Sequence, residues 1–487
     1  MTAKENKTNF LSNLFLLNLL NLMIKPIWLL VVDREVQLIL GPHEYGMFYR
    51  AFNFVFLFNI LLDLGINNYT SKEQASNANF VPLHLKTMVY AKVLLAVVFF
   101  VLVTIISKQL GHNTQLRSIL YLLAGYQIVL GFFQFFRSIL VGYQEYGTDV
   151  VFSVLEKGLL IFTLFIIFLN PNFAQKLSAQ NYAKIHLVVI VLACFVLVLY
   201  GTKKIGLSAK KSNKSILSFT EILKKTFPFA LLGILMNLYT RLDVFMIGQI
   251  IPQSEFWIAQ YVKGFRLLDA LNMVAALSAG FLLPLFSKFK HNINWVQHNT
   301  TAFFEMFLWL VLPTVIFGFF HKAQIIIFLY GSEEWQIAAK SFGILIWVFL
   351  AMSGVYVFGT MLTAMGKLKQ MNLMAGITLI FNFFLNLHFI PKQGIVGAAK
   401  VTLLSQAIFA LFCIYQVWRI SRLKWNVLKI RNMILLLIFL ISIAYLFDLQ
   451  SKSLLLSIGV ETVVYFLLSI PLGLVPKKET FLDIDKH

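Results

Sequence analysis

Long apolar stretches separated by short polar connections dominate the chain from about residue 10 to about residue 475. Each stretch holds about 20 residues, the length that an α-helix needs to cross a hydrocarbon layer of ~30 Å. We place fourteen spans, at about 11–33, 47–66, 86–107, 118–142, 150–169, 185–202, 226–250, 259–287, 300–320, 341–363, 370–390, 395–418, 432–447 and 453–475. The pattern predicts an all-α integral membrane protein.

The longest hydrophilic connection follows the sixth span and divides the chain. "GPHEYGMFYRAF" after span one is similar to "PQSEFWIAQYVKGF" after span seven. Six spans is an even number, so a repeat of six keeps its orientation about an axis along the membrane normal. We therefore expect two six-helix lobes around a central cavity plus a two-helix C-terminal tail: 1–203 (N-lobe), 204–225 (basic cytoplasmic linker), 226–418 (C-lobe) and 419–487 (spans thirteen, fourteen and the tail).

The composition supports a membrane protein and gives its orientation. Of the residues, 59% are hydrophobic and 13% charged, whereas a soluble domain has about a quarter charged residues. The net charge of +20 would suggest nucleic acid in a soluble protein, but cytoplasmic loops of membrane proteins are rich in Lys and Arg. With the N-terminus inside, more than half of the 41 cations are cytoplasmic. We expect both termini in the cytoplasm, the first span to be retained, and no nucleic-acid partner.

Several classes of chemistry lack their signatures. The sequence contains no phosphate-binding G-x-x-x-x-G-K-[ST] loop, no "TVGYG" filter and no cluster with metal-ligand spacing. Cys194 and Cys413 both lie in apolar stretches, which argues against a disulfide framework. We therefore predict no catalytic residues, no metal and no cofactor.

Charged residues inside the spans are the candidates for function, because each costs ~2.5–3.5 kcal/mol to insert. Lys92, Lys157 and Lys400 lie near span ends, where a long side chain can reach the interface. Arg137 is left open between structure and function. Asp63 and Glu305 could simply pair with a neighbouring helix. Four carboxylates could bind a coupling H⁺ or Na⁺: Asp63, Glu156, Asp269 and Glu305.

Five cations on four helices share the outer half of the membrane: Lys25, Arg50, Arg241, Lys263 and Arg266. Two interpretations remain open, a cationic cavity between the halves that binds an anionic substrate, and unrelated helix–helix pairs. Arg241 and Asp243 are two residues apart, about 200° round a helix, and so point to opposite sides. We expect Arg241 to face the substrate and Asp243 to face a neighbouring helix.

Prolines inside spans free backbone carbonyls and permit bending. Pro26 interrupts span one, Pro284 lies near the inner end of span eight, and Pro313 lies inside span nine. Each is compatible with a moving helix or with a static packing kink.

Three stretches together resemble the polysaccharide-transport branch of the multidrug/oligosaccharidyl-lipid/polysaccharide exporter superfamily. "LGPHEYGMFYRAF" followed by "LLDLGINNYTSKE" resembles its first hairpin. "RLDVFMIGQIIPQSEFWIAQYVKGFRLLD" resembles the start of its second half. "TAMGKLKQMNLMAGITLIFNFFLNLHFIPKQGIVGAAKVTLLSQ" resembles its spans ten to twelve. The similarity covers nearly the whole chain in the right order.

The resemblance implies a bilobed transporter that exports an undecaprenyl-pyrophosphate-type lipid-linked oligosaccharide by alternating access, as for O-antigen, lipopolysaccharide or capsule repeat units. It implies cavity cations on spans one, two and eight, where this chain has Lys25, Arg50, Lys263 and Arg266. It also implies a bacterial inner membrane, contact with membrane lipids, and polysaccharide-assembly proteins as further partners. Two departures are the lysine in span one, where an arginine is common, and "NPNFAQKLSAQ", where a Gly-Ala-Ala-like turn would mirror the second half.

Three rival functions remain. A multidrug–cation antiporter of the same superfamily should prefer an acidic cavity, whereas cations exceed carboxylates here. A membrane-bound polysaccharide polymerase should carry larger external loops, whereas the longest loop here is cytoplasmic and basic. A structural scaffold would not need buried cations. We therefore predict a flippase, not an enzyme.

Overall fold

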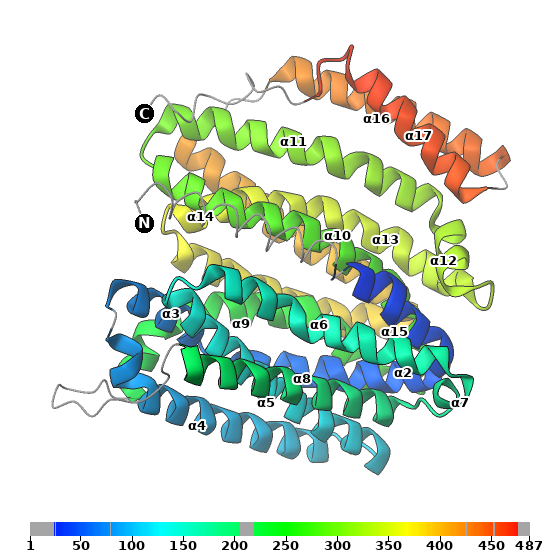
Figure 1. Cartoon of the computed structure of the whole chain (residues 1–487). Coiled ribbons are helices and arrows are strands. Elements are labelled where there is room, and N and C mark those ends of the chain that lie inside the picture. Colours follow the sequence, from blue (N-terminus) through cyan, green and yellow to red (C-terminus); the bar gives the residue numbers. More distant parts are fainter. Residues whose placement is uncertain are drawn as a thin grey trace. The chain divides into compact units, whose positions relative to one another are not determined.

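The computed structural model describes residue 24 and residues 26–77, 79–204, 219–423, 426–450 and 453–475 (Figure 1). Within these ranges the regular structure is helical and contains no strand. The chain divides into two compact units, residues 1–248 with 253–259, and residues 249–252 with 260–487. Each unit is described by itself.

The first unit contains the helices up to α9. Their bounds are η1 Trp28–Val32, α2 Asp33–Leu57, η2 Asn59–Leu62, α3 Ile66–Ser76, α4 Phe80–Gln109, α5 Thr114–Gly142, α6 Tyr146–Leu169, α7 Pro171–Ala174, α8 Ala179–Lys204 and α9 Phe219–Ile250.

The second unit contains most of α10 and all later helices. Their bounds are α10 Ser254–Phe289, α11 Ile293–Phe320, α12 Lys322–Tyr330, α13 Trp335–Gly354, η3 Val355–Gly359, α14 Thr360–Ala364, α15 Leu368–Ser421, α16 Val427–Gln450 and α17 Leu454–Ser469.

The predicted all-α membrane class is confirmed. Among the described residues eight helices are long and apolar enough to cross a membrane, or nine if the bent pair Trp28–Leu57 and Asn59–Ser76 is one span. Because α15 holds two predicted spans, these elements account for spans two to six and nine to thirteen. The remaining spans correspond to α9, α10 and the shorter α17, and most of span one lies outside the described residues.

Two of the helices contain a reversal made by proline and glycine. In α2 the backbone leaves the helical region at Gly41, with φ 71° and ψ 172°, and Pro42 begins the next helix. Proline suits the first turn of a helix because its missing N–H would have no partner there. In α15 the two residue types occur in the opposite order. The backbone leaves the helical region at Gly394, with φ 58°, three residues after Pro391. These are the turns between spans one and two and between spans eleven and twelve.

The clearest break inside a span does not fall at any of the three prolines singled out in the sequence. Span two bends by 51° between α2 and α3. Leu64 and Gly65 both adopt left-handed backbone conformations, with φ of 44° and 83°. Pro313, in contrast, lies inside α11, which continues through it.

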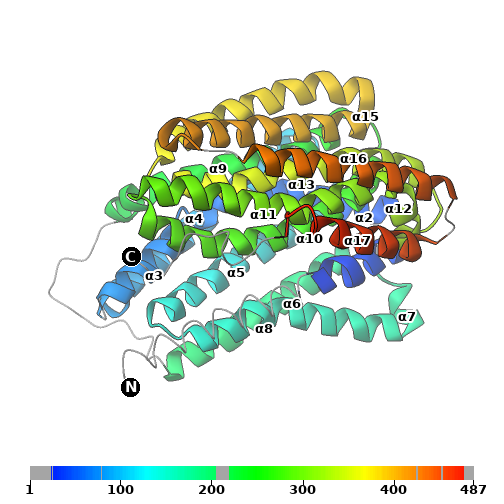
Figure 2. The ribbon, with the colours of Figure 1, turned by 90° about the horizontal axis from the view of Figure 1, so that it is seen from above.

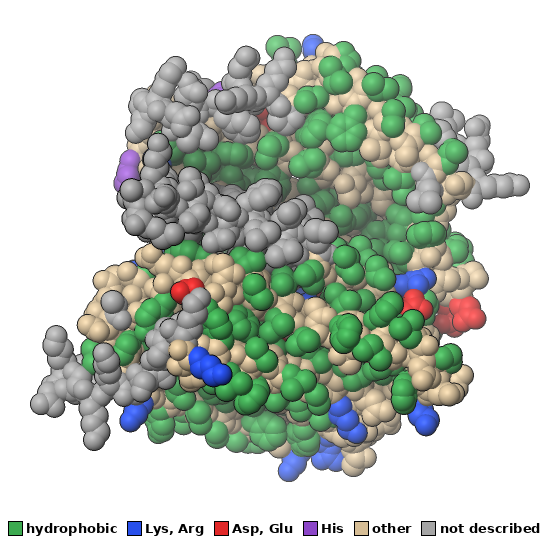
Figure 3. Space-filling model, in the orientation of Figure 1, with side chains coloured by type: hydrophobic (Ala, Val, Ile, Leu, Met, Phe, Trp, Pro, Cys, Tyr) green, Lys and Arg blue, Asp and Glu red, His purple; other side chains and the backbone are tan. Residues whose placement is uncertain are grey.

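Apolar side chains make the cores within the units and the outer faces toward lipid. In the first unit one cluster joins α3, α4 and α5, and a second joins α5, α6 and α8. In the second unit α16 and α17 pack against α11, and the three lie side by side in both views (Figure 2). Large apolar residues are exposed along α4, α8 and α15, and green side chains cover much of the visible face (Figure 3). Such faces suit hydrocarbon.

Candidate functional site

In the first unit α2 and α9 lie against each other through polar and small residues. Asn53 Nδ2 donates to the backbone oxygen of Arg241 at 2.8 Å. A Cβ added to Gly248 would lie 3.1 Å from Nε of Arg50. Arg241 and Gly248 are seven residues apart, about 10 Å along a helix. Two of the predicted substrate cations therefore follow the same contact between α2 and α9.

Arg50 is fixed by a carboxylate at the start of α10, within the part of that helix that belongs to the first unit. Its Nη1 donates to Oε1 of Glu255 at 2.6 Å, and the two side chains are 19% and 17% exposed. One turn earlier on α2, a Cβ on Gly46 would lie 1.8 Å from the backbone oxygen of Glu255. Only glycine permits this approach, so the backbone holds Glu255 beside Arg50.

Arg241 and Asp243 differ as their spacing predicts. Asp243 is buried, whereas Arg241 is partly exposed. Nη1 of Arg241 lies 3.2 Å from the Tyr49 hydroxyl, and its guanidinium carbon lies 5.3 Å from the centre of the Phe56 ring. An aromatic face attracts a guanidinium without neutralising its charge. The two side chains thus differ in exposure, and the substrate-facing role of Arg241 stays a prediction.

His112 lies in the turn between α4 and α5. Burial and the nearby guanidiniums of Arg50 and Arg117 lower the pKa of His112 to about 4. Its Nδ1 lies 3.2 Å from the Ser107 hydroxyl. At neutral pH the imidazole is therefore uncharged. Arg117, at the start of α5, is a second arginine in the electrostatic environment of His112, and sequence reasoning missed it.

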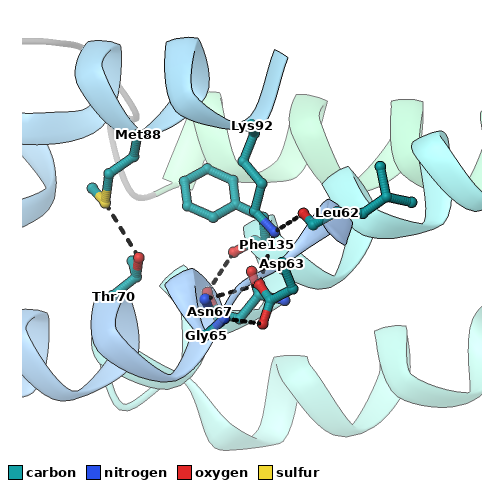
Figure 4. Close-up of polar contacts among 9 residues, drawn as sticks. Leu62, Asp63, Gly65, Asn67, Thr70, Met88, Lys92 and Phe135 are labelled. Atoms are coloured by element: carbon teal, nitrogen blue, oxygen red, sulfur yellow. Dashed lines mark hydrogen bonds and ion pairs between the residues drawn. The ribbon is translucent and has the colours of Figure 1, made fainter. Parts of the chain in front are cut away.

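Asp63 closes the break in span two together with Lys92 of α4 (Figure 4). Lys92 Nζ donates to Asp63 Oδ1 at 2.8 Å and to the Leu62 oxygen at 2.9 Å. The carboxylate also accepts from the backbone N–H groups of Gly65 and Asn67, at the start of α3. Lys92 is 2% exposed, so the prediction that its side chain reaches the interface is wrong. The carboxylate at the break holds it inside the protein instead.

Two other predicted coupling carboxylates also contact lysines. Glu156 Oε1 accepts from the Tyr126 hydroxyl at 2.8 Å and from Lys157 Nζ at 3.0 Å. Glu305 of α11 accepts from Lys429 of α16 at 2.8 Å. The Glu305 contact fits the expectation that this carboxylate pairs with a neighbouring helix.

The remaining charged positions differ in their surroundings. Arg137 forms a two-pronged contact with Asp149 at 2.7 and 3.0 Å, which favours a structural role for this arginine. Asp269 lies close enough to Tyr356 to interact with it electrostatically. Lys400 is exposed and donates to the Gln393 side chain.

In the second unit α10 carries Lys263 and Arg266, both partly exposed. Nζ of Lys263 lies 5.7 Å from the centre of the Tyr330 ring, and the Tyr330 hydroxyl donates to the Lys263 backbone oxygen at 3.4 Å. Three residues apart on a helix, the two cations lie on neighbouring positions of one side. Both cations are available on one side of α10, and their binding of an anion stays a prediction.

The five predicted cations are not all placed. Lys25 lies outside the described residues. Arg50 and Arg241 belong to the first unit, and Lys263 and Arg266 to the second. Their convergence on one substrate stays a prediction.

Sequence reasoning missed two buried polar groups. Asp33 accepts from the Tyr45 and Tyr182 hydroxyls at 2.8 and 3.1 Å. His321, between α11 and α12, lies 2.8 Å from Glu461 of α17, and both side chains are fully buried. Glu461 stands alone in an apolar stretch, a signal of the kind used for the other intramembrane charges. Among the described residues no group of His, Cys, Asp and Glu could hold a metal ion.

Solved structures give the class of fold. The chain is similar to the structure titled "Lipid II flippase MurJ, inward closed conformation", with a TM-score of 0.72 and 16% identity over 95% of this chain and 98% of that chain. An inward-facing multidrug resistance MATE family transporter has a TM-score of 0.60 and 14% identity over 83% and 98%. A MOP superfamily transporter from Pyrococcus furiosus has a TM-score of 0.61 and 15% identity over 86% and 96%. A search of curated proteins finds no significant match.

The chain thus has the all-helical membrane fold shared by MurJ and the transporters of the MOP superfamily. The sequence model described as "polysaccharide biosynthesis protein" matches residues 10–290, more than half of the 487 residues. The chain belongs to this polysaccharide biosynthesis protein family. The resemblance seen in the sequence is confirmed.

Proposed function

We propose that this protein is a flippase that moves a lipid-pyrophosphate-linked oligosaccharide, such as an O-antigen, lipopolysaccharide or capsule repeat unit, across a bacterial inner membrane. The observation that carries the proposal is the pair of partly exposed cations in each unit, on membrane helices of a polysaccharide biosynthesis protein. The fold of a structure named as a lipid II flippase supports the same reading.

The cations suit the phosphate part of such a substrate. A pyrophosphate carries two or more negative charges, and a guanidinium can contact two phosphate oxygens at once. We assign Arg50 and Arg241 in the first unit, Lys263 and Arg266 in the second, and Lys25 by analogy to phosphate binding. Translocation needs two conformations and a site that both can reach, without covalent chemistry.

The rest of the substrate and the coupling are assigned more coarsely. The undecaprenyl-type tail can remain among membrane lipids while the sugars cross, and polysaccharide-assembly proteins would supply and remove the cargo. Asp63, Glu156, Asp269 and Glu305 are the candidates for a coupling H⁺ or Na⁺. A lysine contacts each of Asp63, Glu156 and Glu305. That lysine would have to move away before a coupling ion could bind to the carboxylate.

The function is tested by removing both cations from one side of α10. In a strain that lacks its own copy of this gene, the Lys263→Ala/Arg266→Ala variant should reach the membrane and restore no surface polysaccharide. Each lost charged contact to phosphate costs about 1.5–3 kcal/mol. Lys108→Ala/Lys176→Ala is the matched control, because it removes two exposed lysines and should restore polysaccharide fully. Full restoration by the α10 variant at normal expression would contradict the proposal.

A second comparison uses Arg241 and Asp243. Arg241→Gln should fold normally and transport poorly, because the arginine is partly exposed beside aromatic groups. Asp243→Asn should lower thermal stability first, because this side chain is buried. Equal loss of stability in both variants would remove Arg241 from the substrate-binding residues.

The proposed topology has both termini in the cytoplasm. A cysteine at Glu333, in the turn before α13, should react with a membrane-impermeant thiol reagent in intact spheroplasts, and one at Lys211 should not. The reverse pattern would overturn the orientation.

A further inference from the structure

The outward-side cation of the first unit already holds a negative partner. Arg50 Nη1 and Glu255 Oε1 are 2.6 Å apart. Glu255 lies in the first turn of α10, where the helix dipole favours a carboxylate. The close approach of Gly46 to the backbone of Glu255 fixes the main chain of this partner, although its side chain can still turn away.

The second unit places two carboxylates on a turn that contacts α10 near Lys263. Tyr330 ends α12, and the turn that follows contains Glu333 and Glu334, both exposed. Gln260 Nε2 lies 3.4 Å from Oε2 of Glu334, so the turn lies against α10 one helical turn from Lys263. Glu334 adopts a left-handed conformation with φ 49°, which a non-glycine residue rarely adopts without support from its surroundings.

We propose that Glu255 and the Glu333–Glu334 pair are resident counter-ions that exchange with the substrate's phosphate oxygens. This inference rests on the proposed function of Arg50 and Lys263. In the empty protein the Glu255 carboxylate occupies a position next to Arg50 that a phosphate oxygen takes in the loaded protein, and Glu334 lies beside α10 one helical turn from Lys263. Cargo binds by displacing the carboxylates and leaves when they return.

The exchange accounts for both selectivity and release. A monovalent anion replaces the contact of the counter-ion that it displaces with one similar contact. Its net binding free energy is therefore small. A pyrophosphate carries two or more charges on one molecule, and two of its oxygens can contact the Arg50 guanidinium in place of the single Glu255 contact. In the proposed topology both acidic segments lie on the outer side of the membrane, where the cargo must be released. Returning carboxylates would then oppose rebinding on that side.

The inference predicts that removing a negative charge strengthens anion binding. Full-length protein in detergent is titrated with sodium pyrophosphate at fixed ionic strength in a calorimeter. Glu255→Gln should bind about 10-fold more tightly than the wild type, which corresponds to a free-energy difference of about 1.4 kcal/mol. Glu333→Gln/Glu334→Gln tests the second unit by itself. Because these residues are exposed, this variant should fold even if Glu255→Gln does not.

Glu44→Gln is the matched control. Glu44 lies on α2 two residues before Gly46, and its carboxylate accepts from the Ala179 N–H at 2.7 Å. The variant removes the same charge without removing a counter-ion of Arg50 or Lys263. Its affinity for pyrophosphate should stay within about twofold of the wild type, since this carboxylate contacts Ala179 and Gln115 rather than one of the two cations.

A transport measurement distinguishes counter-ion exchange from a purely structural role of the carboxylates. If release requires the carboxylates, the tighter-binding variants should restore less surface polysaccharide than the wild type despite normal expression. Wild-type binding with unchanged or weaker binding in both glutamine variants would overturn the counter-ion inference and leave the proposed function standing. Failure of the wild type and of both variants to bind pyrophosphate would contradict the phosphate-binding role of the cations, and with it the proposed function.

Discussion

Replacement of Lys92 by methionine should destabilise the first unit by about 3 kcal/mol. Lys92 Nζ bridges the Leu62 oxygen and the Asp63 carboxylate at 2.9 and 2.8 Å. Removing one partner of a buried ion pair costs roughly 3–5 kcal/mol, because the other charge remains without compensation. Asp63 is 27% exposed on its side chain, so water can recover part of that loss, and methionine keeps apolar contact with Phe135. The value therefore lies near the lower limit.

The assay is equilibrium unfolding of the purified protein by SDS in mixed micelles. Glu35→Gln is the control, because the Arg34–Glu35 pair is exposed, at 29% and 42% of the side chains. An exposed pair contributes about 0–1 kcal/mol. The double variant Lys92→Met/Asp63→Asn should recover part of the loss, since no charge is left uncompensated and the asparagine oxygen can still accept from the start of α3.

The reasoning is refuted if Lys92→Met and Glu35→Gln have the same free energy of unfolding. It is also refuted if the double variant is less stable than Lys92→Met by the full effect of Asp63→Asn alone. That additivity would mean that the two side chains do not stabilise each other.

Three further effects follow from single positions. Gly46→Ala should prevent normal folding or strongly lower the melting temperature in thermal denaturation, because its Cβ would lie 1.8 Å from a backbone oxygen. Gly158→Ala is the control and should be neutral or stabilising, because its Cβ would meet nothing within 4 Å. Because the pKa of His112 is lowered to about 4 from 6.5, the unfolded chain binds a proton that the folded chain does not. Stability should therefore fall by up to about 3 kcal/mol as the pH is lowered through that interval, and His112→Gln should remove this part of the slope in unfolding measured against pH. Glu461→Ala should cost about 1–3 kcal/mol in SDS unfolding, because it removes a hydrogen-bond partner of the fully buried His321, and a loss below about 0.5 kcal/mol would contradict that role.

Most of the fold could be predicted because the length of an apolar stretch is a strong signal for a membrane-spanning helix. A helix must satisfy its backbone inside the membrane, so each apolar stretch of about 20 residues becomes one span. The turns at Gly41–Pro42 and at Pro391–Gly394 also follow from local chemistry. The break at Leu64 and Gly65 was not predicted, because it depends on Lys92, a residue of another helix.

The candidate site was only partly predictable for the same reason. The opposite sides of Arg241 and Asp243 follow from helix geometry alone. The partner of Lys92 does not, because snorkelling and pairing have the same sequence signature and differ only in which helix lies opposite. Glu255 was visible as an external residue, but its contact with Arg50 depends on Gly46 allowing two backbones to meet.

The closure of span two by a lysine of the next span has a consequence for insertion into the membrane. Asp63 leaves the ribosome 29 residues before Lys92, an interval of a few seconds at about 5–20 residues per second. During that time the Asp63 carboxylate and the Leu62 backbone oxygen lack the hydrogen bonds that Lys92 donates to them. Polar and charged groups without such partners are costly in hydrocarbon. We therefore expect span two to stay in the translocon, or at its aqueous edge, until α4 has been synthesised, because this avoids the cost of exposing the carboxylate to hydrocarbon. The two helices then enter the bilayer as a pair, and substitution of either charge would be felt first as lost protein during synthesis.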